Sequence, residues 1–177
     1  MAADTELMAA EIVKAAGKAF RQLFENGESY YYCTLITTGE ALAPTVSAWT
    51  WEALARVTQQ NPQDAYWLKW SYGDSPYWLA GDEYFATVKK MFSERTPVDY
   101  LHLPAYWEDE VPPRLQAMEQ AMMELDRQGI FSLNQPRDAV CIHVEMMPPD
   151  AGNTQRALRL NQPQSQAMQA WLAEAAE

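Results

Sequence analysis

Two histidines and two cysteines are the side chains of this 177-residue chain that are best suited to nucleophilic or metal chemistry. Cys141 and His143 are two residues apart, so on an extended strand they point to the same side. A metal site would need further ligands from elsewhere, and a catalytic pair would need Cys33 beside His143 on a neighbouring strand. The sequence has no Gly-x-Ser-x-Gly turn and no phosphate-binding glycine loop. We therefore predict no catalytic residues, no metal site and no cofactor.

A run of aromatic and acidic residues offers a different kind of chemistry. Tyr106 and Trp107 precede Glu108, Asp109 and Glu110. Consecutive carboxylates can hold a metal ion, and more often they only solvate a loop. Beside aromatic rings they also match a surface that binds a basic protein, because the rings supply contact area and the carboxylates steer association. The predicted partner-binding residues are Trp78, Asp82, Glu83, Tyr106, Trp107, Glu108, Asp109 and Glu110.

Residues 67–78 form the densest aromatic stretch of the chain. They can build a core beneath a turn, and they can also form a ligand cage or a platform on which flat groups stack. Stacking of nucleic acid would require interleaved basic residues, and only Lys69 is present there. The first two interpretations remain open at this point.

The net charge of the chain disfavours some classes of binding partner. The formal net charge is -11, which repels nucleic acid and anionic membranes and favours a basic protein partner or simple solubility. The length fits one domain, residues 1–177, and no apolar run reaches the about 20 residues that span a bilayer. Two cysteines and an acidic N-terminus without a signal-peptide pattern favour a cytoplasmic location.

The first half of the chain contains clear helix and strand patterns. Apolar residues recur at helical spacing over residues 8–24, with Asp4 or Thr5 as the expected N-cap and Gly27 at the end. Residues 29–37 and 41–49 are predicted to pair as a β-hairpin. Thr50 is the expected cap of a short helix that extends to residue 60.

The rest of the chain contributes further expected elements. We predict a third strand at residues 65–72, a helix at 83–95 capped by Asp82, and an irregular proline-rich segment at 96–113. A helix follows at 114–128, ended by Gly129, and then a strand at 138–147 with one buried and one wetter face. A short edge strand at 156–161 and a closing helix at 164–177 complete the chain. This order predicts an α+β fold, a small and mainly antiparallel single-layer sheet covered by about five helices.

Four segments of the sequence resemble the bacterial family called domain of unknown function 4303. They are the tyrosine-rich strand at 30–35, the stretch 70–85 with Gly81-Asp82-Glu83, the segment 124–131, and Leu158-Arg159-Leu160-Asn161-Gln162-Pro163. The likeness extends from about residue 12 to residue 163. Members of that family resemble the small acidic immunity proteins that are encoded beside secreted antibacterial toxins.

Residues and resemblance together favour a binding protein over an enzyme. The expected function is that of a cytoplasmic immunity protein, which binds a cognate toxin domain and occludes it, with no nucleic acid or membrane as partner. A small hydrolase or metal-dependent enzyme built on Cys141 and His143 is the first alternative. A regulatory module that binds another protein is the second.

Overall fold

The computed structural model describes residues 2–96, 98 and 101–176, beginning with the long helix α1, Ala2–Phe24. Its apolar side is buried, and the helix ends where predicted. The N–H of Gly27 donates to the carbonyl of Phe24 at 3.2 Å, and Gly27 has a left-handed φ of 72°. The expected cap at Asp4 or Thr5 is wrong, because both residues already lie inside the helix.

Three strands form one mixed sheet in the order β2-β1-β3. The central strand β1, Tyr30–Thr38, pairs antiparallel with β2, Thr45–Thr50, which confirms the predicted hairpin. On its other side β1 pairs parallel with β3, Cys141–Met147. The α+β class is confirmed, although only one of the two strand pairings is antiparallel.

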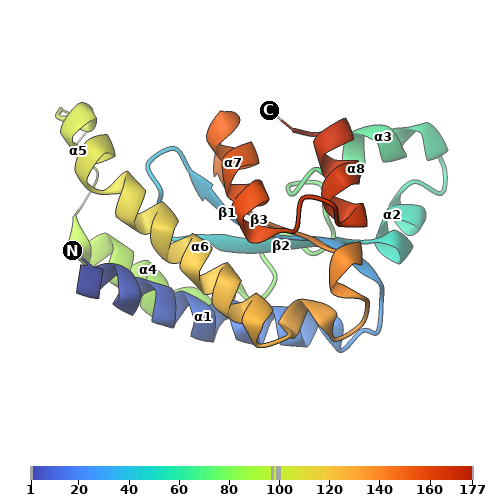
Figure 1. The fold of residues 1–177 in the computed structure, drawn as a ribbon, viewed down its shortest axis with the longest axis horizontal. Coiled ribbons are helices and arrows are strands. Elements are labelled where there is room, and N and C mark those ends of the chain that lie inside the picture. The colour runs from blue at the N-terminus through green and yellow to red at the C-terminus, as the bar shows by residue number, and fades with distance from the viewer. Residues whose placement is uncertain (1, 97, 99–100, 177) are drawn as a thin grey trace.

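Helices cover both faces of this sheet. Figure 1 shows α1 and the helix α6, Val111–Arg127, on one side, and α7, Ala151–Leu160, with α8, Gln166–Glu174, on the other. The side facing α1 and α6 is apolar and includes Leu35, Val46 and Ile142. The opposite side carries polar groups, yet it is also buried, since His143 has no exposed area and Glu145 only 8%. The wetter face predicted for residues 138–147 is therefore wrong, because α7 and α8 exclude water from it.

The segment after β2 is helical and not extended. Thr50 caps α2, Trp51–Val57, as predicted, by accepting the N–H of Ala53 at 2.9 Å. A single 3-10 turn, Pro62–Asp64 (η1), leads into α3, Ala65–Leu68. The strand predicted at residues 65–72 is wrong.

Side chains of the sheet replace the backbone partners that a third strand would have needed at this place. The hydroxyl of Tyr31 donates to the carbonyl of Lys69 at 2.6 Å, and Trp49 Nε1 donates to the carbonyl of Ser71 at 2.6 Å. Because these carbonyls are satisfied by side chains, residues 69–71 are fixed against the sheet without joining it.

A tight approach of two backbones begins the next helical segment. Gly81 has a φ of 64°, and a Cβ placed on it would lie 2.6 Å from the Cβ of Ala19 in α1. The 3-10 helix η2, Asp82–Phe85, follows and continues into α4, Ala86–Arg95. Asp82 makes no capping hydrogen bond there; it pairs with Lys89 Nζ at 2.6 Å, so the predicted cap is wrong.

The segment predicted to be irregular, residues 96–113, is largely helical where it is described; residues 97, 99 and 100 lie outside the described part. It contains α5, Leu103–Asp109, and the start of α6. Pro104 occupies the first turn of α5, and Pro112 the first turn of α6. Proline is tolerated at those positions because the first N–H groups of a helix have no partner inside the helix. The prolines therefore begin helices here and do not interrupt them.

The C-terminal part contains two 3-10 turns, Ile130–Ser132 (η3) and Arg137–Ala139 (η4), and both precede β3. The edge strand predicted at residues 156–161 is wrong, because these residues belong mostly to α7. Asn153, Arg156, Ala157 and Leu160 are the buried residues of α7, and this is helical spacing. The closing helix is confirmed as α8.

Side chains of α7 and the residue after it close the free edge of β3. Asn161 accepts the N–H of Ile142 at 3.0 Å and donates to its carbonyl at 2.7 Å. Asn153 makes the same pair of bonds to Met146, at 2.8 and 3.1 Å. Arg156 Nε donates to the carbonyl of Val144 at 2.9 Å. These groups take the place of a fourth strand, so this edge is not open for pairing with another chain.

Candidate functional site

Helix α5 is fixed to the rest of the molecule through its inner side. Tyr106 is buried with Ala41 and Val111, and its hydroxyl donates to the carbonyl of Glu40 at 2.8 Å. In Figure 1, α5 lies at one end of the molecule, joined to α6. Tyr106 therefore serves as an internal anchor and is not presented to a partner.

Glu110, the residue after α5, is a second internal anchor. Its carboxylate accepts hydrogen bonds from Arg95 Nε at 2.8 Å and from Thr96 Oγ1 at 2.9 Å. Arg114 Nε lies 3.5 Å from the same carboxylate, and Arg95 also reaches Asp4 at 3.4 Å. The charge of Glu110 is thus neutralised inside the fold, and this network joins α5 to α1, α4 and α6.

The outer side of α5 carries Trp107, Glu108 and Asp109, which we call the acidic-aromatic surface. All three residues are exposed, with 49% of Trp107 accessible to solvent. An indole beside two charges, on a helix held from behind, is the part of the predicted set that a partner could contact.

The other predicted residues lie in a different part of the molecule. The ring of Trp78 lies tilted at 52° against that of Tyr72, with centroids 5.1 Å apart, and Asp82 is paired with Lys89. Glu83 is exposed on η2, which packs against α1, α4 and β2, whereas α5 packs against α6. The structure therefore does not bring Trp78, Asp82 and Glu83 together with the acidic-aromatic surface.

The cysteines and His143 do not form the pair that a thiol enzyme would need. The residue of β1 opposite His143 is Thr34, and Cys33 faces the apolar side of the sheet. Burial raises the pKa of both thiols. The ring of His143 lies 4.6 Å from that of Trp171, and burial lowers the pKa of His143 from 6.5 to about 3. His143 is thus a buried neutral imidazole on the polar face of the sheet.

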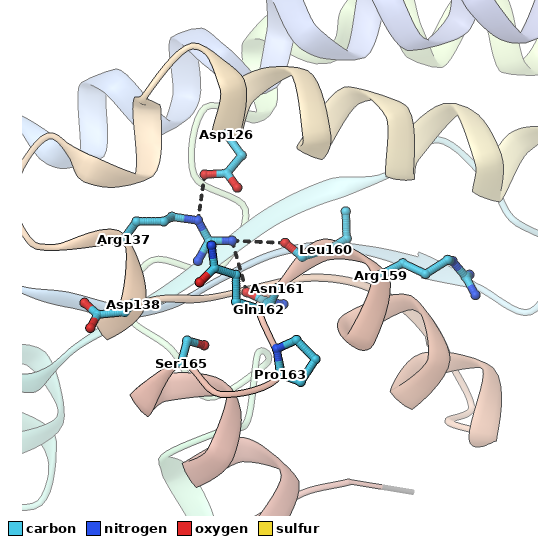
Figure 2. A pocket seen from close by; sticks show the side chains of 9 residues that line it. All are labelled: Asp126, Arg137, Asp138, Arg159, Leu160, Asn161, Gln162, Pro163 and Ser165. Carbon is cyan, nitrogen blue, oxygen red and sulfur yellow. Dashed lines mark hydrogen bonds and ion pairs between the residues drawn. The ribbon is translucent and has the colours of Figure 1, made fainter.

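A polar cleft of about 580 Å³ opens between α6, η4 and the segment that follows α7 (Figure 2). Arg137 spans it: Nε donates to Asp126 Oδ1 at 2.6 Å, and Nη2 donates to Asn161 Oδ1 at 3.1 Å. Its remaining bonds go to the carbonyls of Val140 and Leu160. Most N–H groups of Arg137 are therefore used to join the layers of the fold. Sequence reasoning missed this cluster, since its members are too far apart in the chain to show a local pattern.

The described residues offer neither a metal centre nor a membrane-spanning helix. Within the described ranges, no group of three or more His, Cys, Asp or Glu side chains is placed to hold a metal ion. No helix in that part of the chain combines the length and apolar character that crossing a membrane requires.

These features define an α+β protein in which a three-stranded mixed sheet lies between two layers of helices and an acidic-aromatic helix lies at one end. Residues 10–162 match the model of the family described as a domain of unknown function (DUF4303). The chain belongs to this family, because the match covers most of its length, and the resemblance found in the sequence is confirmed. No curated protein and no solved structure matches the chain.

Proposed function

We propose that this protein is a cytoplasmic immunity protein, which binds a basic toxin domain and occludes it. The arrangement of α5 carries the proposal. Tyr106 and Glu110 fix the helix from inside, while Trp107, Glu108 and Asp109 face outward. A surface that is ordered before binding loses less conformational entropy when the complex forms.

The chemistry of the surface supports a protein partner. Tryptophan is enriched among the residues that dominate binding energy, and carboxylates around it accelerate the approach of a basic partner. The net charge of -11 acts in the same direction at longer range. A stable complex of this kind buries about 1,200 to 2,000 Å² in total, so residues around α5 would also contribute.

The first experiment identifies the partner and then truncates the indole. The gene is co-expressed with neighbouring toxin genes, and growth of the cells is scored. The toxin domain whose effect is relieved is then used in a binding assay. We expect Trp107→Ala to weaken binding by about 2 kcal/mol, because a half-exposed indole at the centre of an interface is a typical hot spot. Unchanged affinity for the rescued toxin would remove α5 from the interface without removing the function itself.

Two matched charge reversals distinguish the effect of the acidic-aromatic surface on association from the effect of the overall net charge. Glu108→Lys with Asp109→Lys should mostly slow association and reduce its dependence on salt. Glu25→Lys with Asp138→Lys makes the same change in net charge at exposed positions outside the predicted partner-binding set. Equal slowing by both pairs, measured by stopped flow, would mean that only the overall field matters.

A further inference from the structure

A hollow of about 290 Å³ lies between α3 and the end of α8, on a part of the molecule that α5 does not reach. Figure 1 shows these two helices next to each other. Tyr66, Trp67 and Trp70 form its aromatic walls, and Glu174 supplies a carboxylate. Tyr66 and Trp70 are four residues apart, a spacing that places both on one side of a helical turn.

The aromatic walls are unusually open to solvent. Tyr66 is 72% exposed and Trp67 is 75% exposed, although both are large rings. Their planes are nearly perpendicular, at 86°, with centroids 4.8 Å apart. Adjacent exposed rings are costly to leave in water, and the different orientations of the two planes give the hollow walls on more than one side.

An ammonium group of the chain lies beside this hollow, against the Trp70 ring that the hollow shares with a neighbouring one. Lys69 Nζ lies 5.0 Å from the centroid of Trp70 and 2.9 Å from a carboxylate oxygen of Glu174. Trp70 Nε1 also donates to Glu174, at 2.8 Å. The hydrogen bond from Lys69 is the main reason that the pKa of Glu174 is lowered, so this carboxylate stays ionised.

The base of the hollow is held in a fixed position. Trp70 is flanked by Lys69 and Ser71, whose carbonyls accept the hydrogen bonds from Tyr31 and Trp49. The rings of Tyr31 and Tyr32 make edge-to-face contacts with Trp70, with centroids 5.3 and 5.8 Å away. The site therefore needs little ordering before a ligand enters.

We infer that this hollow is a binding site for an organic ammonium cation. Aromatic faces attract such a cation through their quadrupole, and the carboxylate of Glu174 offsets the positive charge of Lys69 beside the hollow. The ring walls also contact the alkyl groups on the nitrogen, whereas a metal ion would require oxygen ligands that the walls do not offer. The same chemistry is presented by a free quaternary amine and by a lysine side chain of another protein. This inference does not depend on the acidic-aromatic surface.

The test follows the Trp67 indole N–H signal by NMR during titration with choline. A parallel titration uses 3,3-dimethylbutanol, which has the same shape without the charge. We expect saturable shifts with choline and binding of the neutral alcohol that is at least about tenfold weaker, because the charge supplies the attraction. Equal binding of the two compounds, or no saturable shift with choline, would overturn the inference.

Two substitutions then separate ring chemistry from apolar contact, with isothermal titration calorimetry as the readout. Trp67→Phe keeps an aromatic face and should retain choline binding to within about threefold, whereas Trp67→Leu should weaken it at least about fivefold. Leu133→Ala, an exposed truncation elsewhere, is the control and should bind as the unchanged protein does. Equally tight binding of choline by the Trp67→Leu variant would contradict a binding site made of aromatic rings.

A third titration, with Nα-acetyl-lysine amide, identifies the source of the cation. Tighter binding of this compound than of choline indicates a lysine side chain of a partner protein, and the reverse order indicates a free quaternary amine. Both orders support the site when choline itself binds, whereas absence of choline binding overturns it.

Discussion

The two faces of the sheet are equally buried, but different interactions stabilise them. Toward α1 and α6, side chains such as Leu35 and Ile142 form an apolar core that needs only matching shapes. Toward α7 and α8, the neighbouring residues Thr34 and His143 are just as inaccessible, with no exposed area. Buried polar groups usually find hydrogen-bond partners, so this second face depends on specific pairs. The ring nitrogens of His143 are exceptions, because neither has a hydrogen-bond partner among the described residues.

The pairs on the polar face connect the sheet to the segments that form the molecular surface. The hydroxyl of Tyr32 donates to Glu145 Oε2 at 2.6 Å, and Ser47 Oγ donates to the carbonyl of Tyr72 at 2.8 Å. The first bond joins two strands within the sheet, and the second positions the aromatic segment after α3. We therefore expect the apolar face to supply most of the stability and the polar face to set where this outer segment lies.

The largest expected effect is on the apolar face. Leu35→Ala removes a fully buried side chain from the central strand and should lower the free energy of unfolding by about 2 to 5 kcal/mol. Urea denaturation measures the change. Leu133→Ala, at a position that is 57% exposed, is the control and should stay within about 0.5 kcal/mol. A small effect at Leu35 would mean that the polar layer carries the stability.

An intermediate effect is expected at the edge of the polar layer. Asn161→Ala leaves the N–H and carbonyl of Ile142 without their partners and should cost about 2 kcal/mol in the same assay. Gln162→Ala, at the exposed neighbouring residue, provides the control. If both variants unfold like the unchanged protein, water satisfies the edge of β3 as well as Asn161 does.

The smallest effect depends on pH and concerns His143. Its folded pKa is lowered from 6.5 to about 3 by burial, with Arg156 as a weaker cause, and Glu145 Oε1 lies 3.9 Å from Nδ1. Below pH 6.5 the imidazole is protonated in the unfolded chain but stays neutral in the folded protein. The free energy of unfolding therefore falls as the pH falls. His143→Phe should remove this part of the dependence, about 1.4 kcal/mol between about pH 7.5 and about pH 5.5. Parallel stability curves for variant and unchanged protein would show that His143 titrates normally.

Sequence patterns found the elements that bury one apolar side. The first helix, the hairpin, the capped helix after Thr50 and the helix ended by Gly129 all carry local signals, namely helical or alternating apolar spacing, a capping hydroxyl and a left-handed glycine. The same reasoning failed for α3 and α7. The inner positions of α7 include polar groups that bond to the edge of the sheet, such as Arg156, and a hydrophobicity pattern counts these groups as exposed. Helix α3 has only four residues, Ala65–Leu68, which is too short to show a helical period.

The candidate sites show the same division. The aromatic and acidic composition of residues 106–110 is visible in the sequence, but the roles within it are not. Only the packing of α5 shows that Tyr106 and Glu110 face inward, because their partners, Glu40 and Arg95, come from distant parts of the chain. The exposure of Tyr66 and Trp67 was equally hidden, since aromatic residues are buried more often than not.

The sequence by itself determined the α+β class, the family and the strongly acidic charge, because these depend on composition and on short-range spacing. Only the tertiary structure decided that the alternate face of β3 is dry, that α7 closes its edge, and which rings and carboxylates remain in water. The physical reason is that burial and pairing are set by whatever packs from elsewhere in the chain. A side chain's own neighbours in sequence do not contain that information.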